Sequence, residues 1–130
     1  MEVKKLKVLI VDDDPSVRMA LRATLVDSGF QVRTAESPYS ALDIADEYHP
    51  DVVVSDWELG TALNGIELCK ALIGRIPRAK IILMTGAEKS RMEKAAASVR
   101  PCAVLQKPFD MYSLVGELEK LGRMSYQIAF

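Results

Sequence analysis

The stretch Lys7–Pro15, KVLIVDDDP, indicates how this chain folds, because an apolar run ends abruptly in three acids and a proline. Its apolar part, Val8 to Val11, has the length and residue types of a buried strand. Asp14 followed by Pro15 is typical of a helix start, with an N-cap residue and proline at the first helical position. We therefore predict a strand over 7–11 that leads directly into a helix.

The same strand-then-helix order recurs along the chain, and its strands are almost continuously apolar, which favours a parallel sheet covered on both faces. Right-handed crossovers then favour an α/β, flavodoxin-like (βα)5 fold, a doubly wound parallel sheet with strand order 2-1-3-4-5. Residues 1–121 form the predicted domain, and 122–130 are expected to be a tail or the start of a linker. Further strands are predicted over 31–35, 51–57, 80–85 and 103–106, and helices over 15–28, 38–48, 66–76, 89–99 and 110–121.

Composition excludes several classes of protein. A chain of 130 residues, 49% of them hydrophobic, is long enough for one domain with its own core. Its 17 basic and 18 acidic side chains give a net charge of −1, so no general attraction to nucleic acid is expected. Two distant cysteines and one histidine exclude a disulfide scaffold and an ordinary Cys/His zinc site. With no long apolar run, we expect a cytoplasmic protein that binds no membrane.

Polar side chains follow four of the five predicted strands, at the point where each strand ends. The carboxyl ends of parallel strands meet at one edge of the sheet, where ligands of such folds bind. We therefore expect these side chains to lie close together. They are Asp12 and Asp13 after the first strand, Asp56 and Glu58 after the third, Thr85 at the end of the fourth and Lys107 after the fifth.

The electrostatics of this edge point to a metal. Two carboxylates about 4 Å apart repel each other by roughly 1 kcal/mol in water, and by about 4 kcal/mol at the dielectric found near a protein surface. Lys107 supplies one compensating charge, and a hard divalent cation that prefers oxygen ligands would supply two more. Mg²⁺ fits that description, so we expect a magnesium site. The chain carries no GxGxxG, Walker, GxSxG or HExxH motif, and acids after the first strand repel phosphate unless a metal intervenes.

Four motifs in register resemble the receiver domain of bacterial two-component response regulators, including the chemotaxis regulators. The resemblance covers about residues 5–121 and implies a phosphorelay signalling domain rather than an enzyme. Its expected partner is a sensor histidine kinase or a phosphotransfer protein, and its expected downstream surface is the face of the fourth helix, fifth strand and fifth helix. The motifs are VLIVDDDPSVR, VVVSDWEL with NGIEL, IILMTG and LQKPF.

The resemblance also implies a role for each residue of the cluster. Asp56 would accept the phosphoryl group, and Asp13 would bind Mg²⁺ directly with support from Asp12. The backbone carbonyl of Glu58 would be a further metal ligand, while its carboxylate would hold an attacking water or only add negative charge. The Thr85 hydroxyl would move to donate a hydrogen bond to the phosphoryl group. Lys107 would pair with the phosphoryl oxygens, positioned by a cis Lys107-Pro108 peptide bond.

The chain departs from the family pattern at two places. Val104 stands where family members usually carry Tyr or Phe, and valine cannot perform an aromatic rotamer switch. Gly60 stands where many members have proline, in a loop, Leu59–Gly65, that is expected to be one residue longer than in the chemotaxis regulators.

Two alternatives remain open from the sequence. Val104 favours a degenerate receiver that acts as a phosphorylation-independent protein-binding module, although the complete set of acids argues against it. A phosphohydrolase of the haloacid dehalogenase kind would also use an aspartate nucleophile after a strand. That class usually places a second aspartate two residues after the nucleophile. This chain has Glu58 at that position if Asp56 is the nucleophile, and Asp14 if Asp12 is the nucleophile.

Overall fold

A computed structural model describes residues 6–58 and 65–128 and confirms the predicted fold. Its five strands are all parallel and lie in the order β2-β1-β3-β4-β5. Residues 59–64 of the predicted loop Leu59–Gly65, including Gly60, lie outside the described residues, and Gly65 begins α3. The elements are β1 (Lys7–Val11), α1 (Pro15–Asp27), β2 (Gln31–Ala35), α2 (Pro38–Tyr48), β3 (Val52–Asp56), α3 (Gly65–Arg75), β4 (Lys80–Thr85), α4 (Lys89–Ala95), β5 (Ala103–Gln106) and α5 (Met111–Ile128).

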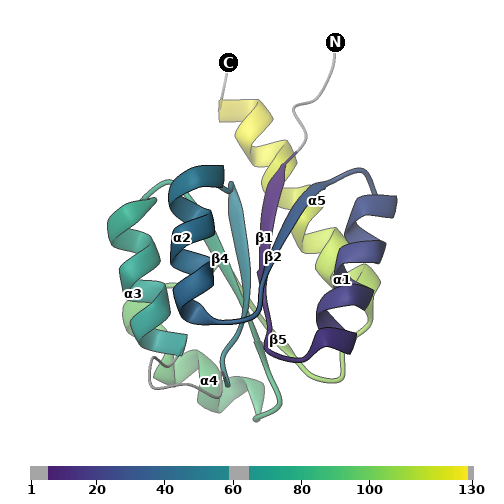
Figure 1. The fold of residues 1–130 in the computed structure, drawn as a ribbon. Coiled ribbons are helices and arrows are strands. Elements are labelled where there is room, and N and C mark those ends of the chain that lie inside the picture. The colour runs from purple at the N-terminus through teal and green to yellow at the C-terminus, as the bar shows by residue number, and fades with distance from the viewer. Residues whose placement is uncertain (1–5, 59–64, 129–130) are drawn as a thin grey trace.

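Helices cover both faces of the sheet because side chains on successive strand residues point to opposite sides. Val8 and Ile10 of β1 pack under α1 and α5, whereas Leu9 and Val11 pack under α2 and α3. Figure 1 shows the two pairs of helices on either side of the sheet. A third cluster lies between α3, α4, the strand β4 and the edge strand β5. Each large aliphatic side chain buried in these clusters contributes about 1.5–3 kcal/mol to folding.

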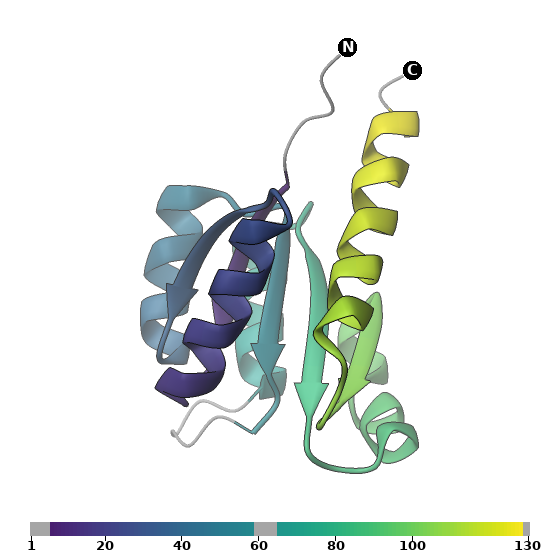
Figure 2. The same ribbon diagram turned by 90° about the vertical axis from the view of Figure 1, so that its right-hand side faces the viewer.

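All strands run in the same direction, so their carboxyl ends share one edge of the sheet, which Figure 2 shows at the bottom of the view beside α4. The start of α1 at this edge is fixed by the predicted cap. Asp14 Oδ1 accepts hydrogen bonds from the amides of Ser16 and Val17 at 2.8 and 3.4 Å, and Pro15 occupies the first turn. Across the described part of the chain, no helix is both long and apolar enough to cross a membrane.

Two helices differ from the prediction. The helix expected over 89–99 ends at Ala95, and a 3-10 turn over Ala97–Val99 replaces its last part. Arg100 then adopts a left-handed conformation with φ of 47°. Pro101 keeps the helical segment from continuing past Arg100, because the residue before a proline avoids the right-handed α conformation, and helices often tighten into a 3-10 turn where they stop.

The last helix is longer than predicted. It was expected to end at Leu121, but α5 continues to Ile128 and extends past the amino-terminal edge of the sheet (Figure 2). The predicted helix stops directly before Gly122, yet one glycine lowers the stability of a helix by only about 1 kcal/mol relative to alanine. No proline follows Gly122, so nothing in the sequence forces the helix to stop there. Part of the segment 122–130, predicted as a tail, is therefore helical.

We expect Gly65→Ala to destabilise the protein by about 1–3 kcal/mol, since overpacking at a tight contact has costs of that size. A Cβ at this position would lie 2.8 Å from the Trp57 carbonyl oxygen and 2.9 Å from the Trp57 ring. In Gly74→Ala, by contrast, the added Cβ meets nothing within 4 Å. That variant should gain up to about 1 kcal/mol from helix propensity. Urea unfolding followed by Trp57 fluorescence measures both, and equal effects of the two substitutions would contradict the contact.

Candidate functional site

Three carboxylates meet at the carboxyl edge of the sheet, as the sequence predicted. Asp12 and Asp13 follow β1, and Asp56 ends β3, which is the strand beside β1. One ligand oxygen from each carboxylate lies within 4.8 Å of the others. Asp12 is fully buried and Asp56 is 5% exposed, whereas Asp13 is exposed. The cluster thus has a buried floor and one side open to solvent.

The Lys107 ammonium, which follows β5, lies beside the two buried carboxylates and partly compensates their charge. Its Nζ lies 3.4 Å from Asp12 Oδ2 and 3.3 Å from Asp56 Oδ2, so one ammonium bridges both buried acids. The Lys107-Pro108 peptide bond is cis, as predicted. Burial alone would lower the pKa of Lys107, but the Asp56 and Asp12 carboxylates outweigh burial and hold this pKa above its ordinary value.

The pKa of Asp56 is also raised, and here burial is the dominant cause. Its carboxylate accepts a hydrogen bond from the Glu58 amide at 3.1 Å and faces the Lys107 ammonium, and both lower the pKa. They do not offset the loss of hydration, to which repulsion from Asp12 adds. Asp56 is therefore a carboxylate whose charge is only partly compensated by the protein.

Backbone contacts hold Asp12 in place. Its Oδ1 accepts a hydrogen bond from the Asp14 amide at 2.9 Å, which ties the strand end to the helix cap. Arg18, on the first turns of α1, donates from its guanidinium to the Asp12 carbonyl oxygen at 2.8 Å. Sequence analysis missed Arg18. The one feature of the sequence that could have indicated this contact is the position of Arg18. It lies one helical turn after the Asp14 cap, on the side of α1 that faces the end of β1.

Thr85 and Glu58 meet directly at the ends of β4 and β3. The buried Thr85 hydroxyl donates to Glu58 Oε1 at 3.0 Å, and the Gly86 amide donates to Glu58 Oε2 at 3.2 Å. The Thr85 oxygen also accepts a hydrogen bond from the Ala87 amide at 3.0 Å. The sequence brought Glu58 to this edge, but neither role considered for its carboxylate included a contact with Thr85.

Val104 occupies a packed position on β5. It is 6% exposed and lies in the cluster that contains Met92 of α4, Ala96 directly after α4 and Cys69 of α3, with Trp57 packed against the cluster. Burial raises the pKa of the Cys69 thiol to about 12, which keeps this cysteine an inert core residue. The valine therefore serves as a fixed aliphatic contact between β5 and α4.

The donor set suits a hard divalent cation. All three candidate ligands are carboxylate oxygens, which Mg²⁺ prefers, and the exposure of Asp13 leaves room for the waters that Mg²⁺ keeps. One lysine cannot balance three acids, and the raised pKa of Asp56 reflects an incompletely compensated charge. These residues therefore fit a divalent metal.

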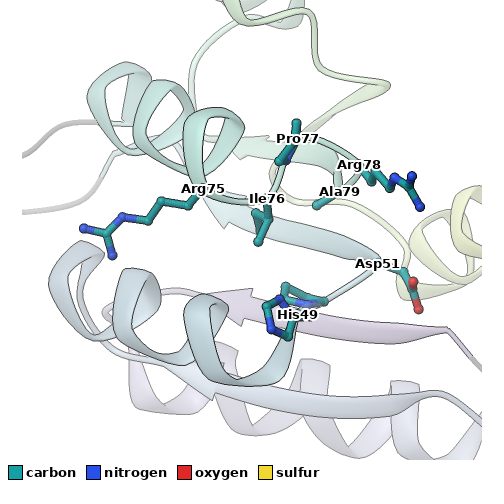
Figure 3. Close-up of a pocket in the computed structure, with 8 residues that line it drawn as sticks. His49, Asp51, Arg75, Ile76, Pro77, Arg78 and Ala79 are labelled. Carbon is teal, nitrogen blue, oxygen red and sulfur yellow. The ribbon is translucent and has the colours of Figure 1, made fainter.

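Two hollows lie outside this cluster. One, of about 370 Å³, adjoins Lys107 and is lined by Val17 and Leu21 of α1 together with Pro108, Phe109 and Met111. The other, of about 350 Å³, lies at the opposite edge of the sheet. Figure 3 shows that the side chains of Arg75 and Arg78 on its rim point away from each other. Arg75 is already paired with Asp46 at 2.8 Å.

Comparison with known proteins points to one family. The family model for the response regulator receiver domain matches residues 8–119. Response regulator MprA of Mycobacterium sp. (strain KMS) and of Mycobacterium tuberculosis (strain H37Rv) are each 31% identical over 117 residues, or 90% of this chain. This chain spans about half the length of those relatives, 50% of each.

Solved structures agree. The chemotaxis protein CheY4 of Vibrio cholerae is 29% identical and superposes with a TM-score of 0.83, over 91% of this chain and 99% of its own. A receiver domain protein from Clostridium thermocellum, 22% identical, superposes with a TM-score of 0.85 over 95% of this chain and 98% of its own, which supports the fold.

The raised pKa of Asp56 predicts a pH-dependent gain in stability for Asp56→Asn in metal-free buffer. Between the unfolded and the folded pKa, the folded protein binds more protons than the unfolded chain, so stability falls as the pH rises through this range. At pH 7 the neutral amide should therefore raise the free energy of unfolding, by up to about 1 kcal/mol. The gain should shrink as the pH falls towards the ordinary carboxyl pKa.

Urea unfolding at several pH values measures this gain. Asp43→Asn, at an exposed carboxylate on α2, is the matched control and should change stability by less than about 0.5 kcal/mol. A loss of stability in Asp56→Asn at neutral pH would show that Lys107 compensates the charge fully.

Proposed function

This chain belongs to the response regulator receiver family, the phospho-accepting domains of two-component signalling, and we propose that Asp56 is its phospho-acceptor. The observation that carries the proposal is the pairing of Asp56 with Lys107 beside Asp12 and Asp13. Asp56 has a raised pKa, and its Oδ2, like Asp12 Oδ2, faces the ammonium.

In the proposed reaction a carboxylate oxygen of Asp56 attacks the phosphorus of a phosphohistidine. The new O–P bond forms as the P–N bond breaks, and the imidazole leaves as the neutral base after taking a proton. The catalytic demand is positioning and neutralisation of the phosphoryl oxygens. Lys107 would follow these oxygens, since its Nζ already lies 3.3 Å from Asp56 Oδ2. The Thr85 hydroxyl would donate a hydrogen bond to one of them.

The proposed cofactor is Mg²⁺, held by the carboxylates of Asp12, Asp13 and Asp56 and by the backbone carbonyl of Glu58. When bound, it would neutralise negative charge on the transferred group. The support for it is chemical, because an all-oxygen donor set with an excess of negative charge suits this ion. Asp13, exposed at the rim, gives the metal access from solvent.

The proposed phosphodonor is a sensor histidine kinase or a phosphotransfer protein. The apolar hollow lined by Val17, Leu21 and Phe109 adjoins Lys107 and would suit a partner helix that brings its phosphohistidine to Asp56. A downstream protein on the face formed by α4, β5 and α5 completes the proposal. The free cysteines Cys69 and Cys102 suit a reducing, cytoplasmic setting for this exchange.

The binding-module alternative rests on Val104 alone. Loss of an aromatic ring from β5 leaves the carboxylates and Lys107 in place, so it removes nothing that the transfer step needs. The phosphohydrolase alternative is not favoured, because Glu58, two residues after Asp56, is engaged with Thr85, and Asp14, two residues after Asp12, caps α1.

Phosphoramidate with Mg²⁺ tests the acceptor. The P–N bond of this small donor breaks and ammonia leaves, so the intact protein should gain the mass of one phosphoryl group, and Asp56→Asn should gain none. Asp43→Asn, which changes an exposed acid elsewhere, should be labelled at the wild-type rate. Labelling that persists in Asp56→Asn would remove the assignment of the acceptor.

Titration with Mg²⁺ followed by Trp57 fluorescence tests the metal site. Trp57 adjoins Asp56 and donates its amide to the Met84 carbonyl, so binding should change its emission at millimolar metal. Asp13→Asn should weaken the apparent affinity at least tenfold, as loss of a direct charged ligand does. A wild-type protein that gives no response, and takes no phosphoryl group, would favour the phosphorylation-independent module.

A further inference from the structure

The Glu58 carboxylate is folded back onto the end of β4, where it holds two donors at once. Its Oε1 accepts the Thr85 hydroxyl and its Oε2 accepts the Gly86 amide, at 3.0 and 3.2 Å. We propose that this carboxylate is an internal latch, which occupies the donors of the β4 end until a phosphoryl group on Asp56 displaces it. The inference rests on the proposed function and adds a regulatory element to that site.

The Thr85 hydroxyl makes the two states mutually exclusive. A hydroxyl has a single hydrogen to donate, and Thr85 gives it to Glu58. Its oxygen meanwhile accepts the Ala87 amide at 3.0 Å, which fixes the orientation of the side chain. Thr85 cannot donate to a phosphoryl oxygen until its hydrogen bond to Glu58 breaks.

Charge supplies the force for release. A phosphoryl group carries about −1.5 to −2 charges at neutral pH, so its arrival on Asp56 places a strong like charge beside the Glu58 carboxylate. The Glu58 amide is anchored to Asp56 Oδ1 at 3.1 Å, so the main chain stays close to the acceptor while the side chain rotates. Because Glu58 is exposed, its released carboxylate can be hydrated.

The latch and the phosphoryl group therefore compete for the same hydrogen, and the coupling between them is reciprocal. Whatever strengthens the bond from Thr85 to Glu58 must weaken the gain from phosphorylation by the same factor. A hydrogen bond to a charged group corresponds to a change of about tenfold or more in an equilibrium constant. Removing the latch should then favour the phosphoryl-bound state by about tenfold.

Beryllium fluoride, an inorganic mimic of the phosphoryl group, measures this equilibrium through Trp57 fluorescence in the presence of Mg²⁺. Glu58→Ala should bind it about tenfold more tightly than the wild type. Glu58→Gln keeps an oxygen acceptor for Thr85, but it loses the negative charge and the second carboxylate oxygen that accepts the Gly86 amide. We therefore expect a smaller gain in affinity for beryllium fluoride. Glu88→Ala is the matched control, since Glu88 is an exposed acid in the connection after β4, and its carboxylate accepts a hydrogen bond from Ser90 and not from Thr85. It should bind like the wild type.

A double-mutant cycle with Thr85→Ala separates the latch from simple charge repulsion. If the latch acts through the Thr85 hydroxyl, Glu58→Ala should bring little further gain in the Thr85→Ala background. An equal tenfold gain in both backgrounds would mean repulsion only and would overturn the latch. The amide resonance of Gly86, recorded without any mimic, should shift in Glu58→Ala but not in Glu88→Ala, and an unchanged resonance would also overturn it.

The outcomes also separate this inference from the proposed function. If phosphoramidate labels Asp56 in the wild type but Glu58→Ala binds beryllium fluoride no more tightly, only the latch is wrong. If the wild type neither binds beryllium fluoride nor takes a phosphoryl group, the proposed acceptor is wrong and the latch falls with it.

Discussion

The rest of this structure depends on two buried carboxylates that are paired with the same lysine. Asp12 and Asp56 end neighbouring strands, and their charges could not stay so close without the Lys107 ammonium at 3.4 and 3.3 Å. Removal of the lysine would cost about 3–5 kcal/mol, because both buried carboxylates would be left uncompensated. The path of the chain after β5, the cap of α1 and the contact with Arg18 all keep these three groups in register. The resulting shortage of positive charge makes the site receptive to a cation, without which the acids would repel a phosphoryl group.

The parallel sheet is what allows residues distant in sequence to meet in this way. Crossover helices return every strand to the same direction, so each strand delivers its last residue to the same edge. The apolar interiors of β1 and β3 fix the register, since a slip of one residue would exchange the faces of every side chain. Asp12 and Asp56 therefore owe their positions to the valines and leucines before them as much as to their own chemistry.

The parts that the sequence predicted are those governed by the ends of strands. Asp12, Asp13, Asp56 and Lys107 each follow an apolar run, so the topology alone brought them together, and the Asp14 cap was readable from one dipeptide. The direction of a flexible side chain was not readable in this way, so the contact between Glu58 and Thr85 was missed. Helix ends were harder still. Pro101 acts only on the residue before it and does not place the end of α4 at Ala95, and a single glycine at 122 was too weak a signal to stop α5.

The packing of Val104 has a mechanical consequence. A β-branched side chain has few rotamers, and this one is enclosed by Met92, Ala96 and Cys69, so it cannot swing between an inner and an outer position. A displacement of the β4 end would then reach α4 through the main chain between Gly86 and Glu88 and through the packed side chains of this cluster, without a rotamer change at Val104. The position of α4 therefore depends on the position of the β4 end. How far α4 can move depends on how far the main chain between Gly86 and Glu88 bends.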